Sequence, residues 1–210
     1  MNFFAVIFVA AAAMLCLAAV RRLMTDCAVG RILKYRQGGN RFLSELYSAA
    51  FGRRYRIIEN IYLPSGKRDG KIYCIPLMLV GRAGIVLVEE KRMSGFIENP
   101  MRGDWRQFHG DRIVQFQNPI ESNLFHAQAL RKRLSAHGYP APPVRGVIVF
   151  SEGDVRFKNR FRQVVTAEPS VGYIRELMKE NVISKIDADR IAEKLIRDSK
   201  RICSSRSIFE

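Results

Sequence analysis

Two charged residues, Glu89 and Lys91, follow an apolar run at a spacing that could place both side chains in one catalytic site. The run from Gly84 is aliphatic and β-branched up to Val88 and then ends in Glu-x-Lys. Because side chains alternate along a strand, this pair is predicted to lie on one face, about 6.5–7 Å apart along it. Such a pair can hold a divalent metal ion and polarise a phosphate, provided that more acidic groups converge there. It also fits a simple ion pair at an exposed strand end, which contributes little to stability.

The elements that must position this pair alternate between helix and strand. A helix is predicted to start at Asn40, a good N-cap residue, and to end at Gly52. Strands are predicted at 55–63, 72–80 and 84–90, looped or hairpin structure at 92–118, a helix at 119–137, a strand at 144–150, and helices at about 170–181 and 187–200. Asp187 is the predicted N-cap of the last helix. This order predicts an α/β fold in which helices cover a central sheet.

The first twenty residues carry no acidic or basic side chain, and the stretch from Phe3 to Val20 is apolar throughout. As a helix, its eighteen residues would be about 27 Å long, which is just enough to span a bilayer. A cleaved signal peptide is the alternative, but the first two residues lack Lys and Arg, and no small-x-small cleavage site follows. We therefore expect an uncleaved N-terminal transmembrane helix.

Basic residues follow this apolar stretch closely: Arg21, Arg22, Arg31, Lys34 and Arg36. The positive-inside rule retains such a flank in the cytoplasm. The chain is thus expected to be a single-pass protein of the inner, cytoplasmic membrane, with its soluble part in the cytosol. No C-x-x-C spacing occurs among the four cysteines, which speaks against a zinc site and fits a reducing compartment.

The formal net charge is +15, and all of it falls after residue 20. A charge of this size favours polyanionic partners, either nucleic acid or the anionic face of a membrane. A solubilising surface without a polyanionic partner is the plainer interpretation.

Four sequence blocks occur in a characteristic order: Gly38-Gly39; Tyr55 to Asn60; Gly84 to Lys91 with Gly95 behind it; and Phe116-Gln117-Asn118-Pro119 followed by His126 and Leu130. Trp105 and the run Val147 to Ser151 add to them. On these residues the chain resembles the nuclease-related domain (NERD) family, a branch of the PD-(D/E)xK nuclease superfamily. The resemblance covers about residues 36–152. It implies a restriction-endonuclease-like core with a mixed central sheet at 38–155, between an anchor at 1–23 with a basic juxtamembrane segment at 24–37 and a helical tail at 156–210.

The resemblance also implies Mg²⁺-dependent cleavage of DNA. The acids would be one residue of the first helix, an Asp of the second strand and the Glu-x-Lys of the third. In this chain the helix acid is Asn40, the Asp is Pro76, and a Gln expected after Asn-Pro is Ser122, so only Glu89 and Lys91 match. Glu89 is then a weak ligand for Mg²⁺, which is usually held by one or two carboxylates together with phosphate oxygens and waters.

Two acids are candidates to replace the missing carboxylate, namely Asp69 in the turn before the second strand and Glu45 on the first helix. Pro76 also lacks a backbone donor, so we expect it at a sheet edge or a bulge.

Four arginines are the predicted contacts to nucleic-acid phosphates: Arg92, Arg102, Arg106 and Arg112. Trp105 and Phe108 are expected to pack in the core rather than to stack on bases, and His126 is as well explained by packing or capping as by function.

The chain is therefore interpreted as a membrane-tethered protein with a nuclease-like fold, which binds nucleic acid, most simply DNA, without sequence specificity and cleaves it poorly. A non-catalytic scaffold or partner-binding module at the membrane and an active Mg²⁺-dependent nuclease with a rearranged acid set are the alternatives.

Overall fold

The computed structural model describes residues 14–17, 19, 42–65, 70–139 and 142–206. The chain divides into two units, one up to Gly52 and one from Arg53 onward. In the first unit, residues 14–17 and 19 are helical and helix α2 spans Phe42–Phe51. Its buried side chains include Leu43 and Leu46 on the predicted apolar face, whereas Glu45 is exposed.

Most of the expected anchor, Phe3 to Val20, lies outside the described residues. Within the part of the chain that is described, no helix combines the length and the hydropathy that a membrane span needs.

The second unit follows the predicted alternation of strands and helices. After the short 3₁₀ helix η1 (Gly52–Arg54), its elements are β1 (Arg56–Pro64), β2 (Ile72–Gly81), β3 (Gly84–Lys91), β4 (Gly95–Glu98), β5 (Trp105–His109), β6 (Arg112–Phe116), α3 (Pro119–Ser135), β7 (Val144–Phe150), β8 (Val155–Phe157), β9 (Val164–Thr166), α4 (Ala167–Leu177) and α5 (Lys185–Arg206).

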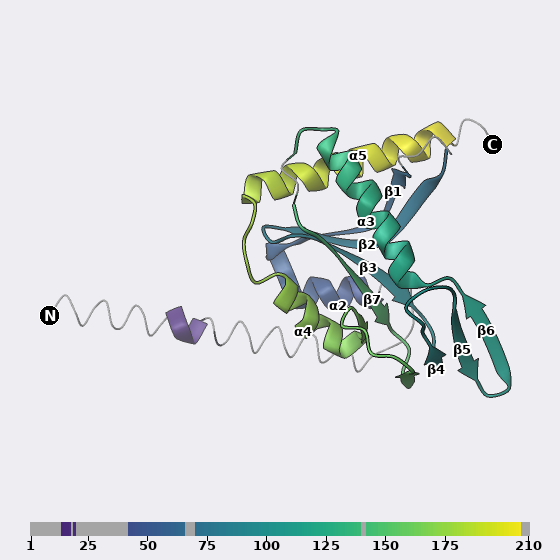
Figure 1. Ribbon diagram of the computed structural model, residues 1–210. Helices are drawn as coiled ribbons and strands as arrows, with labels where there is room; N and C mark the ends of the chain where they lie inside the picture. The colour runs from purple at the N-terminus through teal and green to yellow at the C-terminus, as the bar shows by residue number, and fades with distance from the viewer. Residues whose placement is uncertain (1–13, 18, 20–41, 66–69, 140–141, 207–210) are drawn as a thin grey trace, which may run out of the picture. The chain divides into compact units, whose positions relative to one another are not determined.

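The main sheet has five strands in the order β1-β2-β3-β7-β9. Strands β1, β2 and β3 are antiparallel neighbours, whereas β7 and β9 run parallel to β3. Parallel neighbours need a crossover, and α3 provides it between β3 and β7. The mixed sheet that the resemblance implied is thus confirmed (Figure 1).

Helices α3 and α5 pack on one face of this sheet, and α4 packs against β7 and β9 from the other (Figure 1). The core under α3 and α5 is continuous and includes Met78, Leu87, Leu130 and Ile191, each almost fully buried. Burying each such side chain contributes about 1.5–3 kcal/mol. By alternation from Leu87, Glu89 and Lys91 lie on this same face, at the end of β3.

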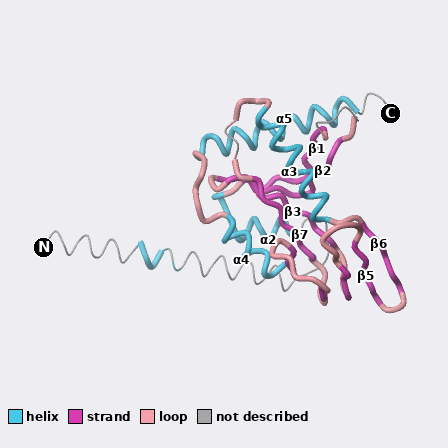
Figure 2. The backbone as a smooth tube through the Cα atoms, in the orientation of Figure 1, coloured by secondary structure: helices cyan, strands magenta, loops and turns pink. Residues whose placement is uncertain are grey.

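A second sheet, ordered β6-β5-β4-β8, carries the hairpin predicted within 92–118. Its β5–β6 arm projects from the body of the unit (Figure 2). The inner face of this sheet packs through Trp105, which is fully buried and stacks against Phe150 and Phe161 with ring centroids 6.4 and 6.3 Å away. The prediction that Trp105 packs rather than stacks on bases is confirmed.

The prediction of a purely helical segment at 156–210 is wrong. Val164–Thr166 is a strand that completes the main sheet beside β7. The last helix also begins earlier than predicted. Asp187 is its third residue rather than its N-cap, because the Ser184 hydroxyl accepts from the Asp187 N–H at 3.0 Å and donates to the Asp187 carboxylate at 2.7 Å.

Gly84 opens β3 with a φ of 110°, which side-chain-bearing residues rarely adopt. A Cβ at this position would lie 2.3 Å from the carbonyl oxygen of Pro143. Gly84→Ala is expected to lower the free energy of unfolding by more than about 2 kcal/mol, because a strained backbone alone costs about 1–3 kcal/mol. Urea unfolding measures this loss. Gly70→Ala, at φ 64° with open space around it, is the control, and an equal loss in both variants would exclude a role for the Pro143 contact.

Candidate functional site

Glu89 and Lys91 form an ion pair at the end of β3, with 2.8 Å between Lys91 Nζ and Glu89 Oε1. Their placement on one face is as predicted, but the surroundings differ from an exposed strand end, because Glu89 is only 8% exposed. Its second oxygen, Oε2, is buried without a hydrogen-bond partner. This oxygen is a free acceptor that faces away from bulk water.

Burial raises the pKa of Glu89, and the charge and hydrogen bond of Lys91 only partly oppose this shift. When the folded pKa of an acid exceeds its unfolded value, the folded state binds the proton more tightly, so stability falls as pH rises from the unfolded pKa through the folded pKa. Glu89 therefore does not serve stability at neutral pH. A buried carboxyl with this property is a candidate for function.

Two rings, those of Phe116 and His126, lie near Lys91. Its ammonium lies 5.9 Å from the centroid of the Phe116 ring. On α3, burial lowers the pKa of His126, and the charge of Lys91 lowers it further, so the imidazole is neutral at neutral pH. The His126 ring also meets Tyr73 of β2 edge-on, with 5.3 Å between centroids. His126 thus packs, as expected, beside the candidate pair, whereas sequence reasoning gave no role to Tyr73.

Strands β2 and β3 separate at this site. Their ladder ends with Leu77 opposite Val88, and the next position along would set Pro76 opposite Glu89. The ladder between β1 and β2 also omits the pair of Asn60 and Pro76, and Asn60 has a φ of 52°. Pro76 is therefore not at a sheet edge but at a break in an inner strand, where its missing N–H is tolerated.

The break also reverses the faces of both strands. In β1, Ile58 and Ile61 both belong to the core under α3 and α5, although they are an odd number of residues apart. In β2 the same holds for Ile75 and Met78. A regular strand would send one member of each pair outward. The reversal brings Tyr73 onto the face of α3.

The described residues do not fit a tightly held Mg²⁺. Glu89 Oε2 supplies one oxygen ligand, but the position expected for a second carboxylate is Pro76, and no group of three His, Cys, Asp or Glu suited to a metal occurs in the described part of the chain. Asn40 and Asp69 lie outside it, and Glu45 is on the exposed face of α2 in the other unit. Ser122 is half-buried in the first turn of α3.

The four predicted arginines do not converge on Glu89. Arg92 approaches Glu90 at 3.5 Å. Arg106 pairs with Glu98 and, by alternation, points to the face of the second sheet opposite Trp105. Arg102 is exposed in the loop before β5, and Arg112 is exposed at the far end of β6 from Phe116.

Sequence reasoning missed two cations of the second sheet. Arg156 and Lys158 alternate with Phe157, which packs against Phe150 with centroids 5.0 Å apart. The pattern of a basic residue on each side of an aromatic residue was the available signal.

One comparison with known proteins finds a family that matches this chain. The sequence profile of the nuclease-related domain matches residues 35–151, more than half of the chain. The chain belongs to the nuclease-related domain (NERD) family. No curated protein and no solved structure matches it. Membership indicates a function related to nucleic acids, and nuclease-related domains typically depend on a metal ion.

Two residues of the matched region, Asn118 and Pro119, have a structural role in this nuclease-related domain. Asn118 Oδ1 caps α3 by accepting from the Ile120 N–H at 3.0 Å, and Pro119 is its first residue. Asn118 Nδ2 also donates to the Met101 carbonyl at 3.2 Å. These contacts fix the helix that carries His126.

Proposed function

We propose that this protein is a membrane-anchored nuclease-related domain that binds nucleic acid without sequence specificity and hydrolyses it poorly. One observation supports the impaired chemistry most directly: the ladder between β2 and β3 ends one pair before Glu89, and the residue of β2 at that next position is Pro76 rather than a second acid. Lys91 further neutralises the single carboxylate. Metal affinity and the activation of an attacking water both decline with each lost ligand.

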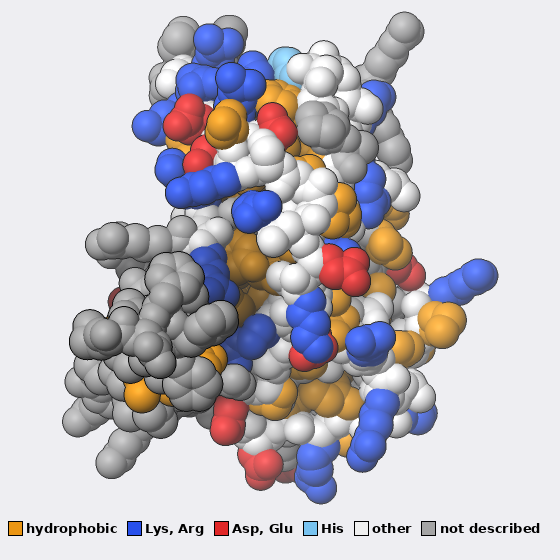
Figure 3. Space-filling model, turned by 90° about the vertical axis from the view of Figure 1, so that its left-hand side faces the viewer, with side chains coloured by type: hydrophobic (Ala, Val, Ile, Leu, Met, Phe, Trp, Pro, Cys, Tyr) orange, Lys and Arg blue, Asp and Glu red, His pale blue; other side chains and the backbone are white. Residues whose placement is uncertain are grey.

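The charge of the chain supports the binding part of this proposal. On the face in Figure 3, Lys and Arg side chains are more widespread than Asp and Glu. The formal net charge of +15 favours phosphate contacts, which release counterions and depend steeply on salt. The apolar stretch from Phe3 to Val20 and the basic residues behind it support the anchor.

The test uses the full chain in detergent, incubated with supercoiled plasmid and Mg²⁺ or Mn²⁺. We expect retention of the plasmid on a gel at 50 mM salt, loss of retention at about 300 mM, and little nicking. Glu89→Ala and Lys91→Ala are expected to bind the plasmid with an affinity within about threefold of the wild type, since the pair contributes at most one phosphate contact. Glu193→Ala, which removes an exposed carboxylate of α5, is the matched control for charge.

Other outcomes favour other functions. Metal-dependent cleavage that disappears in both site variants but not in Glu193→Ala would establish an active nuclease with a rearranged acid set. Failure to retain any plasmid at low salt would contradict nucleic-acid binding and favour a scaffold at the membrane.

A further inference from the structure

A row of four residues crosses the outer face of the second sheet, the face opposite Trp105. The strand registers set Arg156 beside Phe96, Phe96 beside Phe108, and Phe108 beside Ile113. The two phenylalanine rings lie 5.9 Å apart between centroids. Phe96 is 37% exposed and Ile113 is 61% exposed. We name Phe96, Phe108 and Ile113 the outer row.

The fold does not need the outer row for its core. The inner face of the same strands already buries Ile97 and Trp105 completely. An exposed apolar row rimmed by polar groups is a mark of a binding surface.

Cations border the outer row and are held in place. The Arg106 guanidinium lies 5.9 Å from the Phe108 ring centroid and pairs with Glu98. Lys158 Nζ approaches the other oxygen of Glu98 at 2.7 Å. The hydrogen bond from Lys158 and the charge of Arg106 lower the pKa of Glu98, so this carboxylate stays ionised and fixes both cations. Arg156 adds a third positive charge beside Phe96, at the β8 end of the row.

A hollow adjoins the outer row, and hydrogen bonds hold part of its wall in place. It is lined by Glu98, Pro100, Asp104, Arg106, Lys158 and Asn159. Asn159 is fixed by reciprocal bonds to the fully buried Asn99: its N–H donates to Asn99 Oδ1 and its carbonyl accepts from Asn99 Nδ2, both at 2.8 Å. Polar donors and acceptors thus lie beside an aromatic surface, which suits a molecule with both flat apolar and charged parts.

We propose that this outer face is a stacking platform for single-stranded nucleic acid. Unpaired bases stack on Phe96 and Phe108, and Arg106, Arg156 and Lys158 contact phosphates. This inference rests on the proposed nucleic-acid function and assigns it a ligand class. In a duplex the bases are stacked on one another, so they are not free to stack on Phe96 and Phe108. A lipid headgroup has no flat aromatic ring to stack on Phe96 and Phe108, so an anionic membrane is disfavoured.

The test measures the affinity of the full chain in detergent for three fluorescent probes: a 20-nucleotide oligothymidine, an abasic strand of equal length, and a 20-base-pair duplex. The wild type is expected to bind the oligothymidine at least about tenfold more tightly than the abasic strand. The double variant Phe96→Ala/Phe108→Ala is expected to lose that preference and to bind the other two probes as before. Phe125→Ala is the matched control, since Phe125 is 42% exposed on α3.

Because Phe108 is half-buried, Arg156→Glu tests the platform without disturbing packed side chains. Its affinity for oligothymidine should fall by about tenfold, and by more than that of Arg190→Glu, the same change at an exposed position of α5.

Unchanged affinity for oligothymidine in folded Phe96→Ala/Phe108→Ala overturns the platform, while salt-sensitive binding by that variant preserves the proposed function. Failure of the wild type to bind any of the three probes overturns both. Vesicles of phosphatidylglycerol form the last arm: vesicle binding that needs the outer row, without oligothymidine binding, overturns the platform in favour of a lipid surface.

Discussion

Pro76→Asp is expected to raise metal-dependent cleavage of plasmid by more than about tenfold over the wild type. The ladder between β2 and β3 ends at Leu77 and Val88, and one further pair in the same register would set position 76 opposite Glu89, whose Oε2 oxygen has no partner. An Asp there would supply the second carboxylate that Mg²⁺ usually requires. A tenfold rate corresponds to only about 1.4 kcal/mol of transition-state stabilisation, which is small beside what a bound metal ion supplies. Nicking assays across a Mg²⁺ titration measure the effect.

The controls separate the carboxylate from the backbone. Pro76→Asn restores the N–H and has nearly the same shape as Asp but no charge, so it should stay as inactive as the wild type. In the double variant Pro76→Asp/Glu89→Gln the gain should disappear. If Pro76→Asn raises the rate of cleavage as much as Pro76→Asp does, then the restored backbone N–H, rather than a metal ligand, explains the effect.

Local patterns predicted the parts of the fold that depend on local physics. The alternation and the β-branched residues of β3 placed Glu89 and Lys91 side by side, and their ion pair follows from that spacing alone. The Asn-Pro start of α3 likewise depends on neighbours in sequence. Such features need no knowledge of the rest of the chain.

Features set by distant segments could not be predicted in this way. The burial of Glu89 depends on elements far from it in sequence, and its raised pKa follows from that burial. The reversal of faces at Asn60 and Pro76 breaks the period of two on which strand predictions rest. The three residues of β9 are too few for a periodic signal, and pairing with β7 makes them a strand.

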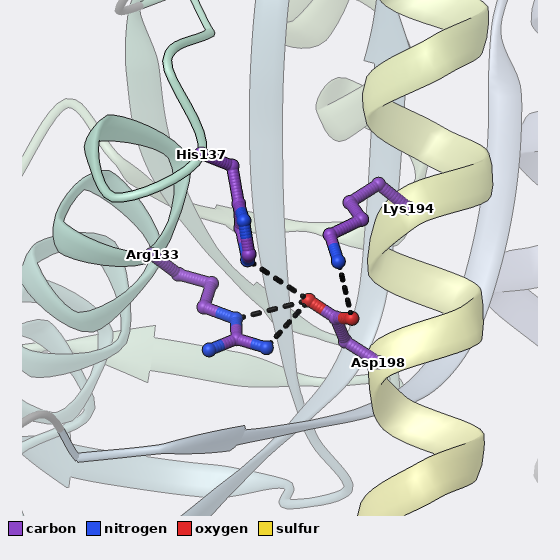
Figure 4. Close-up of polar contacts among 4 residues, drawn as sticks. All are labelled: Arg133, His137, Lys194 and Asp198. Atoms are coloured by element: carbon purple, nitrogen blue, oxygen red, sulfur yellow. Dashed lines mark hydrogen bonds and ion pairs between the residues drawn. The ribbon is translucent and has the colours of Figure 1, made fainter.

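The buried carboxylate Asp198 is a further long-range feature, and it joins α5 to the end of α3. It lies on α5, and Arg133, His137 and Lys194 all point toward it (Figure 4). Arg133 donates two hydrogen bonds to Oδ2 at 2.7 and 2.9 Å, His137 Nε2 lies 3.4 Å from the same oxygen, and Lys194 Nζ lies 3.0 Å from Oδ1. The Asp198 side chain is only 1% exposed, whereas its three partners reach water.

Asp198→Asn is expected to lower the free energy of unfolding by about 3 kcal/mol, near the low end for breaking a buried pair because the cations left behind are hydrated. Burial alone would raise the pKa of Asp198, but the hydrogen bonds from Lys194 and Arg133 outweigh it and hold that pKa below its usual value. A lowered folded pKa stabilises the fold above the unfolded pKa of about 3.9 and loses this effect as pH falls through the folded value. Urea unfolding should therefore show the free energies of unfolding of the wild type and the variant converging below about pH 4.

Glu193→Ala is the control, because it removes an exposed carboxylate of the same helix. It should change the free energy of unfolding by less than about 0.5 kcal/mol. A loss as large as that of Asp198→Asn would mean that the burial of Asp198 and its three partners do not explain the effect.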